Sequence, residues 1–510
     1  MLEEERKYAI DGGGDLPDLA GCLPTGGRVR TLGVATLRAT YFDTSDLRLA
    51  RAGVSLRHRR GDAKPWTVKL PTATVGVRHE ISRSGPVGTI PEELVALLTV
   101  YHQGAPLVPA ATLRTTRHVQ QLCDSADRLL AEVSDDRVTV LDGRRTLSTF
   151  REIEVERHEG GRALLDRVGA ALHTAGAVNG VFTPKHVRAL GPAATAPPEW
   201  TAPSALPERP TAGAVALAAL RTDIARIIEH DPLVRLREPL PDGDTAVHQM
   251  RVGCRRLRSD LRTFAPLLEP EWAGRIRAEL GWIAGVLGAA RDAEVLRERL
   301  RLTAEADPLA PLDAAAVARM DADLAARHEE ALQAVDEAQR SERYLALLKL
   351  LQEAAREPRL TRAARRRAAG VLPALVANTW WQLVRQAGDM RPTGKLDRNA
   401  PDEVWHALRV TAKRARYAAE AVAPVVGGAV PEFARSLAGV QTLLGIHSDA
   451  AVAAETWLAI ARADPDDHAL AVTAGRLYER ERTAIRAARV AFPPVWRATT
   501  RRRLTNWLPT

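Results

Sequence analysis

The chain has 510 residues, which is more than one hydrophobic core usually serves, so two or three domains are expected. Hydrophobic residues make up 45% and charged residues 26%, as in ordinary globular proteins. Lys and Arg outnumber Asp and Glu by 72 to 63, and the net charge of +9 favours an anionic partner such as nucleic acid, polyphosphate or acidic lipid.

The cellular compartment is indicated by features that the sequence lacks. No apolar run approaches the length of a membrane span, and the beginning of the chain, MLEEERKYAI, is acidic where a signal peptide is basic. Cys22, Cys123 and Cys254 are scattered, and their odd number argues against a disulfide framework. We therefore expect a cytoplasmic protein with no membrane partner.

The first part of the chain has the alternation of β-strands. Polar and apolar residues alternate in VSLRHRRG, WTVKLP, GVRHEIS and FREIEVER, and turns with Gly or Asp separate these stretches. Residues two apart share one face of a strand. Three strands then have a charged face, formed by Glu3, Glu5 and Lys7, by Arg57 and Arg59, and by Glu152, Glu154 and Glu156.

Each charged face alone is compatible with a sheet that has one side in water. Together they indicate a binding site, because clustered carboxylates repel unless a cation lies among them, and clustered guanidinium groups repel unless an anion does. Glu oxygens suit Mg²⁺ or Mn²⁺, and Arg offers a planar fork for phosphate. A divalent metal with a polyphosphate satisfies both groups.

These motifs resemble the CYTH superfamily, the triphosphate tunnel metalloenzymes. Its ExExK signature matches Glu3, Glu5 and Lys7, and the segments YFDT, LRHR, REIEVE and PKHVRAL follow in the expected order. The resemblance covers residues 1–190. It implies a closed antiparallel β-barrel whose tunnel binds a triphosphate, in enzymes that hydrolyse inorganic triphosphate, thiamine triphosphate or RNA 5′ ends, or cyclise ATP.

The resemblance also implies roles for single residues. The metal ligands for Mg²⁺ or Mn²⁺ would be Glu3, Glu5, Glu152 and Glu154. The phosphate-binding, catalytic residues would be Lys7, Arg57, Arg59, Lys69, Arg117 and Lys185. Further candidates are Asp135, Asp136 and Glu156.

A Pro- and Ala-rich segment, residues 191–210, has no apolar periodicity and predicts a semi-rigid linker. After it the apolar period is near 3.6, and we expect eight or nine helices from Thr211 onward. Turn signals at PDGD, EPEW, ADPLAP, RPTGKLDRNAP and ADPDD would separate them. The second part of the chain is therefore predicted to be all-α.

The helical part contains an internal repeat. HQMRVGCRRLRSDL begins at His248 and HALRVTAKRARYAAE at His406, and each is followed about forty residues later by a related segment, LGAARDAEV at Leu287 and LGIHSDAAV at Leu444. We expect these later segments to be turns. The repeat predicts two similar multi-helix bundles.

Basic residues of the repeat fall on one helix stripe. The stripes are His248, Arg251, Arg255 and Arg258, and His406, Arg409, Lys413 and Arg416. Stacked like charges destabilise a bare helix by a few tenths of a kcal/mol per pair, roughly, and a bound anion reverses that cost. The alternative, a solvated basic face, predicts interspersed carboxylates, and neither span has one. Codon bias toward Arg is a second alternative, although four of the seven Lys residues stand at motif positions.

These features resemble the CHAD domain, a helical domain of paired four-helix bundles that often follows a CYTH domain. The resemblance covers residues 211–506 and implies binding of inorganic polyphosphate in a basic channel. The residues that it implies are His248, Arg251, Arg255, Arg256, His406, Arg409, Lys413, Arg414 and Arg416, with Arg291, His447 and Tyr417 as weaker candidates. No nucleophile and base constellation is present in this part of the sequence, which predicts a binding module.

The leading hypothesis is a metal-dependent hydrolase of inorganic triphosphate or polyphosphate with a C-terminal polyphosphate-binding domain. The alternative is a non-catalytic protein that binds polyphosphate or targets polyphosphate granules. A nucleic-acid-binding protein is disfavoured, because aromatic residues make up 4% and neither basic helix has a row of stacking residues.

Overall fold

The computed structural model divides into two compact units, residues 1–198 and 199–510. It describes residues 2–10, 16–72, 74–179, 183–203, 205–241, 243–388 and 396–509.

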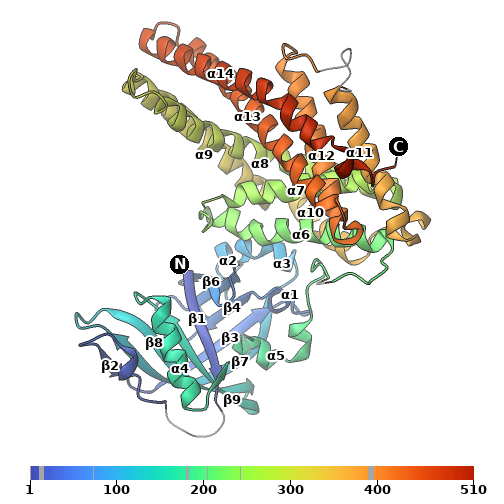
Figure 1. Ribbon diagram of the computed structural model, residues 1–510. Coiled ribbons are helices and arrows are strands. Elements are labelled where there is room, and N and C mark those ends of the chain that lie inside the picture. Colours follow the sequence, from blue (N-terminus) through green and yellow to red (C-terminus); the bar gives the residue numbers. More distant parts are fainter. Residues whose placement is uncertain are drawn as a thin grey trace. The chain divides into compact units, whose positions relative to one another are not determined.

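The N-terminal unit is a closed antiparallel β-barrel (Figure 1). Its strands are β1 (Leu2–Ala9), β2 (Arg28–Thr31), β3 (Ala35–Asp43), β4 (Ser55–Arg59), β5 (Trp66–Pro71), β6 (Val77–Arg83), β7 (Val108–Cys123), β8 (Leu129–Asp142), β9 (Arg145–Arg157) and β10 (Val178–Asn179). The order is β1-β6-β5-β4-β3-β7-β8-β9, and β9 pairs with β1 and closes the ring. Outside the ring, β2 pairs with β7 and β10 with β1. The prediction of a closed antiparallel barrel is confirmed.

The helices of this unit connect the strands or follow the last of them. They are η1 (Ala20–Cys22), α1 (Arg48–Arg51), α2 (Glu92–Leu97), α3 (Thr99–His102), α4 (Arg162–Thr174), α5 (Lys185–Leu190) and η2 (Pro192–Thr195). Leu165, Val168 and Leu172 of α4 pack in one apolar core with Tyr8 of β1 and Val155 of β9. Because neighbouring residues of a strand face opposite sides, this outer core directs the Glu and Lys residues beside it toward the barrel interior.

The C-terminal unit is helical, which confirms the all-α prediction for this part. Its helices are α6 (Ala212–Leu236), α7 (Ala246–Thr263), η3 (Ala265–Leu267), α8 (Pro270–Ala304), α9 (Ala314–Arg340), α10 (Glu342–Arg356), η4 (Arg362–Arg365), η5 (Ala368–Gly370), α11 (Leu372–Ala387), α12 (Asp402–Val426), α13 (Val430–Ala463), α14 (His468–Thr499) and α15 (Arg502–Thr505). Consecutive helices pack against each other from α6 to α9 and again from α11 to α14, and α7 of the first group packs against α12 of the second.

Helix boundaries follow capping signals in the sequence. The side chains of Thr211, Thr245, Asp313, Ser341 and Asp467 each accept a hydrogen bond from a backbone N–H at the start of a helix. The predicted turns at ADPLAP and ADPDD separate α8 from α9 and α13 from α14. Part of RPTGKLDRNAP lies outside the described residues.

The predicted turns at Leu287 and Leu444 are wrong, because both segments lie inside the long helices α8 and α13. Gly without Pro lowers helix stability by about 1 kcal/mol and does not end a helix that packing stabilises. The two glycines have equivalent neighbours. A Cβ at Gly288 would lie 3.5 Å from the Arg251 guanidinium, and one at Gly445 would lie 3.6 Å from that of Arg409. Both arginines therefore lie directly against a glycine of the next helix.

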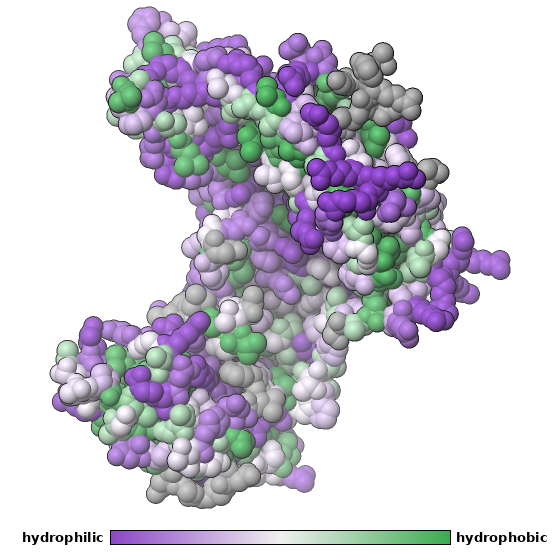
Figure 2. All heavy atoms as spheres, viewed as in Figure 1, coloured by the Kyte–Doolittle hydropathy of each residue, from purple (hydrophilic) through white to green (hydrophobic). Residues whose placement is uncertain are grey.

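Hydrophilic residues are spread over both units on the face that Figure 2 shows, with apolar residues in small groups. None of the helices described here is long and apolar enough to cross a membrane.

Candidate functional site

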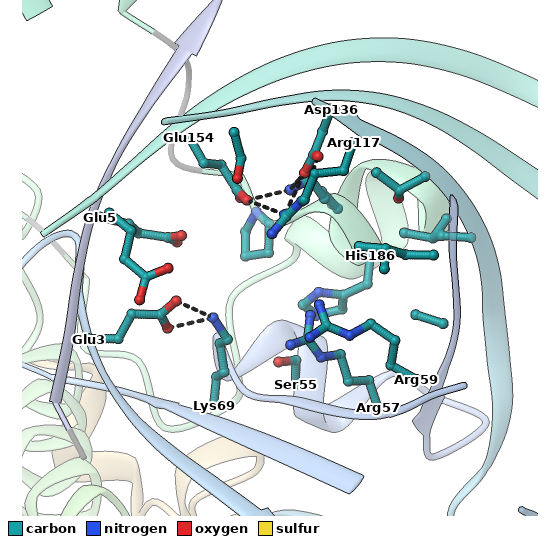
Figure 3. A pocket seen from close by; sticks show the side chains of 18 of the residues that line it. Glu3, Glu5, Ser55, Arg57, Arg59, Lys69, Arg117, Asp136, Glu154 and His186 are labelled. Carbon is teal, nitrogen blue, oxygen red and sulfur yellow. Dashed lines mark hydrogen bonds and ion pairs between the residues drawn. The ribbon is translucent and has the colours of Figure 1, made fainter. Parts of the chain in front are cut away.

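The barrel interior contains a polar cavity of about 270 Å³. Strand pairing aligns its charged residues: Lys7 lies opposite Glu154, Glu5 opposite Glu156, and Arg117 opposite Asp136. Figure 3 shows Glu3, Glu5 and Glu154 on one side of the cavity and the guanidinium groups of Arg57 and Arg59 facing them. The predicted residues that line it are Glu3, Glu5, Glu154, Lys7, Arg57, Arg59, Lys69, Arg117 and Lys185, with the further candidates Asp136 and Glu156.

Glu154 is the centre of an ion-pair network. It is paired with Lys7, with Lys185 at 2.6 Å and with Arg117 at 3.1 Å. Burial opposes ionisation, but the charges of Lys185, Lys7 and Arg117 outweigh it and hold the pKa of Glu154 well below its ordinary value. Burial likewise opposes the charge of Lys7, and Glu154, Glu5 and Glu152 raise its pKa above the ordinary value. Glu154 is thus a fixed negative charge among three cations.

Glu152 lies deeper in the network and is not among the residues that line the cavity. Its side chain is buried, 3.0 Å from the Lys7 ammonium, 3.4 Å from that of Lys185 and 3.5 Å from the Arg188 guanidinium. The structure therefore places Glu152 behind Glu154, where it compensates the charges of the lysines.

A second group of carboxylates surrounds Lys69. Its ammonium donates to Glu3 at 2.7 Å and lies 3.1 Å from Glu80. One lysine does not balance the carboxylates here. Burial, and then the charge of Glu3, raise the pKa of Glu156 to about 7 against the attraction of Lys69, and Glu132 and Glu80 add to this effect. This side of the cavity has an excess of negative charge.

The basic side of the cavity includes a buried donor without an acceptor. The Nε of Arg57 is buried and has no hydrogen-bond partner among the described residues. Arg59 donates to Asp62 at 2.6 Å, and Arg117 is bidentate on Asp136, at 2.8 and 2.6 Å. A phosphate oxygen is an acceptor that matches the free donor of Arg57.

The donor set fits a hard divalent cation, since several carboxylates line one side and their crowding raises the pKa of Glu156. In the conformation described here, lysines hold the carboxylates of Glu3 and Glu154, and within the described ranges no three Asp, Glu, His or Cys side chains converge as a metal site. Metal binding by Glu3, Glu5 and Glu154 would therefore require the lysine contacts to be exchanged for contacts to phosphate.

Several residues that line the cavity were not predicted from the sequence. These are Tyr41, Arg78, Glu80, Glu132 and His186. Strand alternation was a usable signal for Arg78 and Glu80, which are two apart in GVRHEIS. Burial, and then the charge of Arg78, lower the pKa of His186 to about 3, so this ring is a neutral wall that stacks on Tyr41. Asp136 lines the cavity, whereas Asp135 is bidentate on Arg151.

In the helical unit, α7 and α12 bring four basic side chains together: Arg251, Arg255, Arg409 and Lys413. We call these four residues the basic cluster. Burial, and then the charges of Arg255, Arg409 and Arg251, lower the pKa of Lys413 to about 7. Asp292 lies 3.3 Å from Arg251, and Asp449 lies 3.1 Å from Arg409, at the next helices. The cluster retains a local excess of positive charge.

The remaining predicted basic residues lie in two other places. Burial and the charges of Arg277 and Arg258 lower the pKa of Arg414, so these three form a further basic group. Arg256 and Arg416 instead donate to Glu420, each at 2.6 Å. Because Glu420 compensates both, Arg256 and Arg416 are less available to an anion than the basic cluster.

The histidines of the repeat lie beside the basic cluster. Burial and the charge of Arg291 lower the pKa of His248, and burial and the charge of Arg409 lower that of His406. The weaker candidate His447 is buried and accepts from Arg489 at 3.1 Å, and burial together with that guanidinium lowers its pKa to about 4. Because it is buried and bonded to Arg489, His447 is a packed core residue. Another weaker candidate, Tyr417, accepts a hydrogen bond from Arg255 at 3.2 Å.

Comparison with known proteins defines the class of the chain. Residues 1–188 match the CYTH domain and residues 218–459 match the CHAD domain. The chain belongs to the family of proteins in which a CYTH domain is followed by a CHAD domain.

The similar proteins include two from Mycobacterium tuberculosis, strains CDC 1551 and H37Rv, both described as uncharacterized. Each is 31% identical over 507 residues, covering 94% of this chain and 93% of the relative. Among solved structures, PptA from Streptomyces chartreusis is 27% identical with a TM-score of 0.47 and covers 56% of this chain and 99% of that one. The CHAD domain from the plant Ricinus communis is 25% identical with a TM-score of 0.42 and covers 57% of this chain and 95% of that one.

Proposed function

We propose that the barrel hydrolyses inorganic triphosphate or the ends of polyphosphate with a divalent metal, and that the helical unit binds the polyphosphate chain. The observation that carries the proposal is the cavity, in which an excess of carboxylates faces Arg57, whose buried Nε has no acceptor. A linear triphosphate with a metal ion supplies the charge that each side needs.

Members of the CYTH family depend on divalent metal ions, generally Mg²⁺ or Mn²⁺. In this chain Glu3, Glu5 and Glu154 would hold the metal, which when bound would polarise the phosphoryl group and favour attack by water. The positively charged Lys and Arg side chains of the cavity would neutralise the charge of the phosphate chain. Arg57 and Lys185, which both line the cavity, would contact it and supply the electrostatic stabilisation that phosphoryl transfer needs.

The first test is the replacement Glu5→Gln, which keeps the shape of a buried side chain and removes its charge. We expect hydrolysis of tripolyphosphate in Mg²⁺ to fall by about 10²-fold, because one anionic ligand is lost. Phosphate release is the measurement, and Glu92→Gln on the exposed surface of α2 is the control. Unchanged activity of Glu5→Gln would contradict the metal role.

A non-catalytic polyphosphate-binding protein is the second candidate. The observation in its favour is the network in which Lys7 and Lys185 occupy the carboxylates of Glu152 and Glu154. Binding of tripolyphosphate by the purified chain without release of phosphate in Mg²⁺ or Mn²⁺ would favour this candidate.

Lys413 makes polyphosphate binding depend on pH. Its pKa is about 7 beside three arginines, and a bound polyanion would raise it, so binding takes up a proton above pH 7. The affinity is expected to be full below pH 7 and to fall as pH rises from 7 toward 9. Titration of polyphosphate at several pH values is the measurement.

The matched variant is Lys413→Arg, which stays charged over this range. We expect it to bind with little change in affinity between pH 7 and 9. The two histidines, His248 and His406, remain in both proteins and act at lower pH, because burial lowers their pKa below the ordinary value. An equal loss of affinity in both proteins would exclude Lys413 as the titrating group.

A further inference from the structure

The helical unit contains a pocket that the proposed function does not use. It encloses about 680 Å³, a volume that small ligands occupy, between residues 202–203 and 205–210 and the helices α6, α7 and α12. Its walls are largely apolar and include Pro203, Leu206, Pro207, Val215, Pro424 and Val425. Five charged residues line it, namely Glu208, Asp223, Arg256, Asp260 and Glu420.

The charges of this pocket are not balanced. Arg256 donates to Glu420 at 2.6 Å and lies 3.3 Å from Oδ1 of Asp223. The other oxygen, Oδ2 of Asp223, is buried and has no hydrogen-bond partner among the described residues, although Asp223 is 2% exposed. Asp260 adds another buried carboxylate to the same pocket. A buried carboxylate oxygen without a donor is costly, so a donor group that enters the pocket is stabilised there.

The protonation of the two aspartates agrees with a missing cation. Burial raises the pKa of Asp223 to about 7 against the charges of Arg256 and Arg226. Burial, and then the charge of Asp223, raise the pKa of Asp260 well above its ordinary value. Without a ligand, protons take the place that a positively charged donor would fill.

We propose that this pocket binds a small organic amine, with its ammonium group at Asp223 and Asp260 and its apolar stem along Val215, Leu206 and Pro424. An ammonium group has three donors and one charge, which match the free oxygen and the excess of carboxylates. An alkyl stem matches the apolar walls. A metal ion matches less well, because within the described ranges no three Asp, Glu, His or Cys side chains converge as a metal site.

The experiment titrates the full chain with pentylamine by calorimetry, and 1-pentanol is the neutral probe of the same length. We expect saturable binding of one pentylamine and no saturable binding of the alcohol. Asp223 faces Arg226 on its own helix, Arg256 and Asp260 on α7 and Glu420 on α12. Because the amine replaces protons, its affinity should rise between pH 6 and 8, with release of protons to the buffer.

Two variants locate the site. Asp223→Asn removes the charge and should weaken pentylamine binding by about tenfold or more, whereas Glu479→Gln on the exposed face of α14 should leave it unchanged. Ala219→Phe fills the pocket, keeps every charge and should also abolish binding. Circular dichroism confirms that the variants fold.

The proposal would be overturned by any of three results. These are no saturable binding of pentylamine, equal binding of pentanol, or unchanged affinity in the pocket-filling variant. Displacement of pentylamine by Mg²⁺ at one ion per chain would show a metal site in its place. None of these results bears on hydrolysis in the barrel, so the proposed function is tested separately.

Discussion

Replacing all four members of the basic cluster by Ala should lower the affinity of the full chain for polyphosphate by about 10⁴-fold. A hydrogen bond to a charged group contributes about 1.5 kcal/mol, so four contacts contribute about 6 kcal/mol. The fold should persist, because the replacement removes repulsion between charges on α7 and α12. Fluorescence titration of labelled polyphosphate measures the affinity, and circular dichroism measures the helicity.

The control removes the same charge elsewhere. The control variant replaces four exposed arginines outside the cluster, Arg301, Arg356, Arg486 and Arg503. Each quadruple variant changes the net charge from +9 to +5, because four unit charges are removed. Only in the cluster variant should the affinity for polyphosphate lose its strong dependence on salt. The slope of log affinity against log salt concentration should become less negative by roughly 0.7 for each lost contact, if polyphosphate behaves as single-stranded nucleic acid does. Equal affinity of the two variants would show that general charge, and not the cluster, binds the chain.

Glu154→Gln should lower both the free energy of unfolding and the activity. Removing one partner of a buried ion pair costs about 3–5 kcal/mol, because Lys7, Lys185 and Arg117 are left without their shared carboxylate. Hydrolysis of tripolyphosphate should fall by about 10³-fold, since a metal ligand and the position of Lys185 are lost together. Urea unfolding and phosphate release measure the two effects.

Glu156→Gln is the matched control, on the same strand and facing the same cavity. The pKa of Glu156 is about 7 because burial and other carboxylates oppose its charge. Removing that charge should leave the stability unchanged or increase it, by the linkage between pKa and folding. A similar loss of stability in both variants would contradict the network described around Glu154.

Strand alternation in the sequence predicted which charged residues share one face of a strand, and the resemblance to the CYTH superfamily implied that these faces line a barrel interior. The reason is local: Glu3, Glu5 and Lys7 must face one side of a strand wherever that strand lies. Their partners are set by closure of the barrel, which brings β9 beside β1. Lys7 and Glu152, for example, are in contact although they are 145 residues apart in the sequence. Sequence spacing does not contain this pairing, so the lysine contacts of the carboxylates were not predicted.

In the helical unit, the spacing of the basic residues predicted which of them share one face of a helix, but it did not predict the carboxylates that compensate their charge. Arg416 pairs with Glu420 one turn later, a spacing that was visible in the sequence. Arg256 pairs with the same Glu420 across two helices, which required the packing of α7 against α12. The segments at Leu287 and Leu444 were wrongly predicted to be turns, because their similarity shows that they are related and does not show which structure they share.

Metal-dependent hydrolysis in the barrel is tested most directly by phosphate release from tripolyphosphate by the purified full chain, with Mg²⁺ and then with excess chelator. We expect steady turnover in Mg²⁺, loss of turnover in the chelator, and recovery when Mg²⁺ or Mn²⁺ is restored. No release under any of these conditions, or release that the chelator does not change, would contradict a metal-dependent triphosphatase in the barrel.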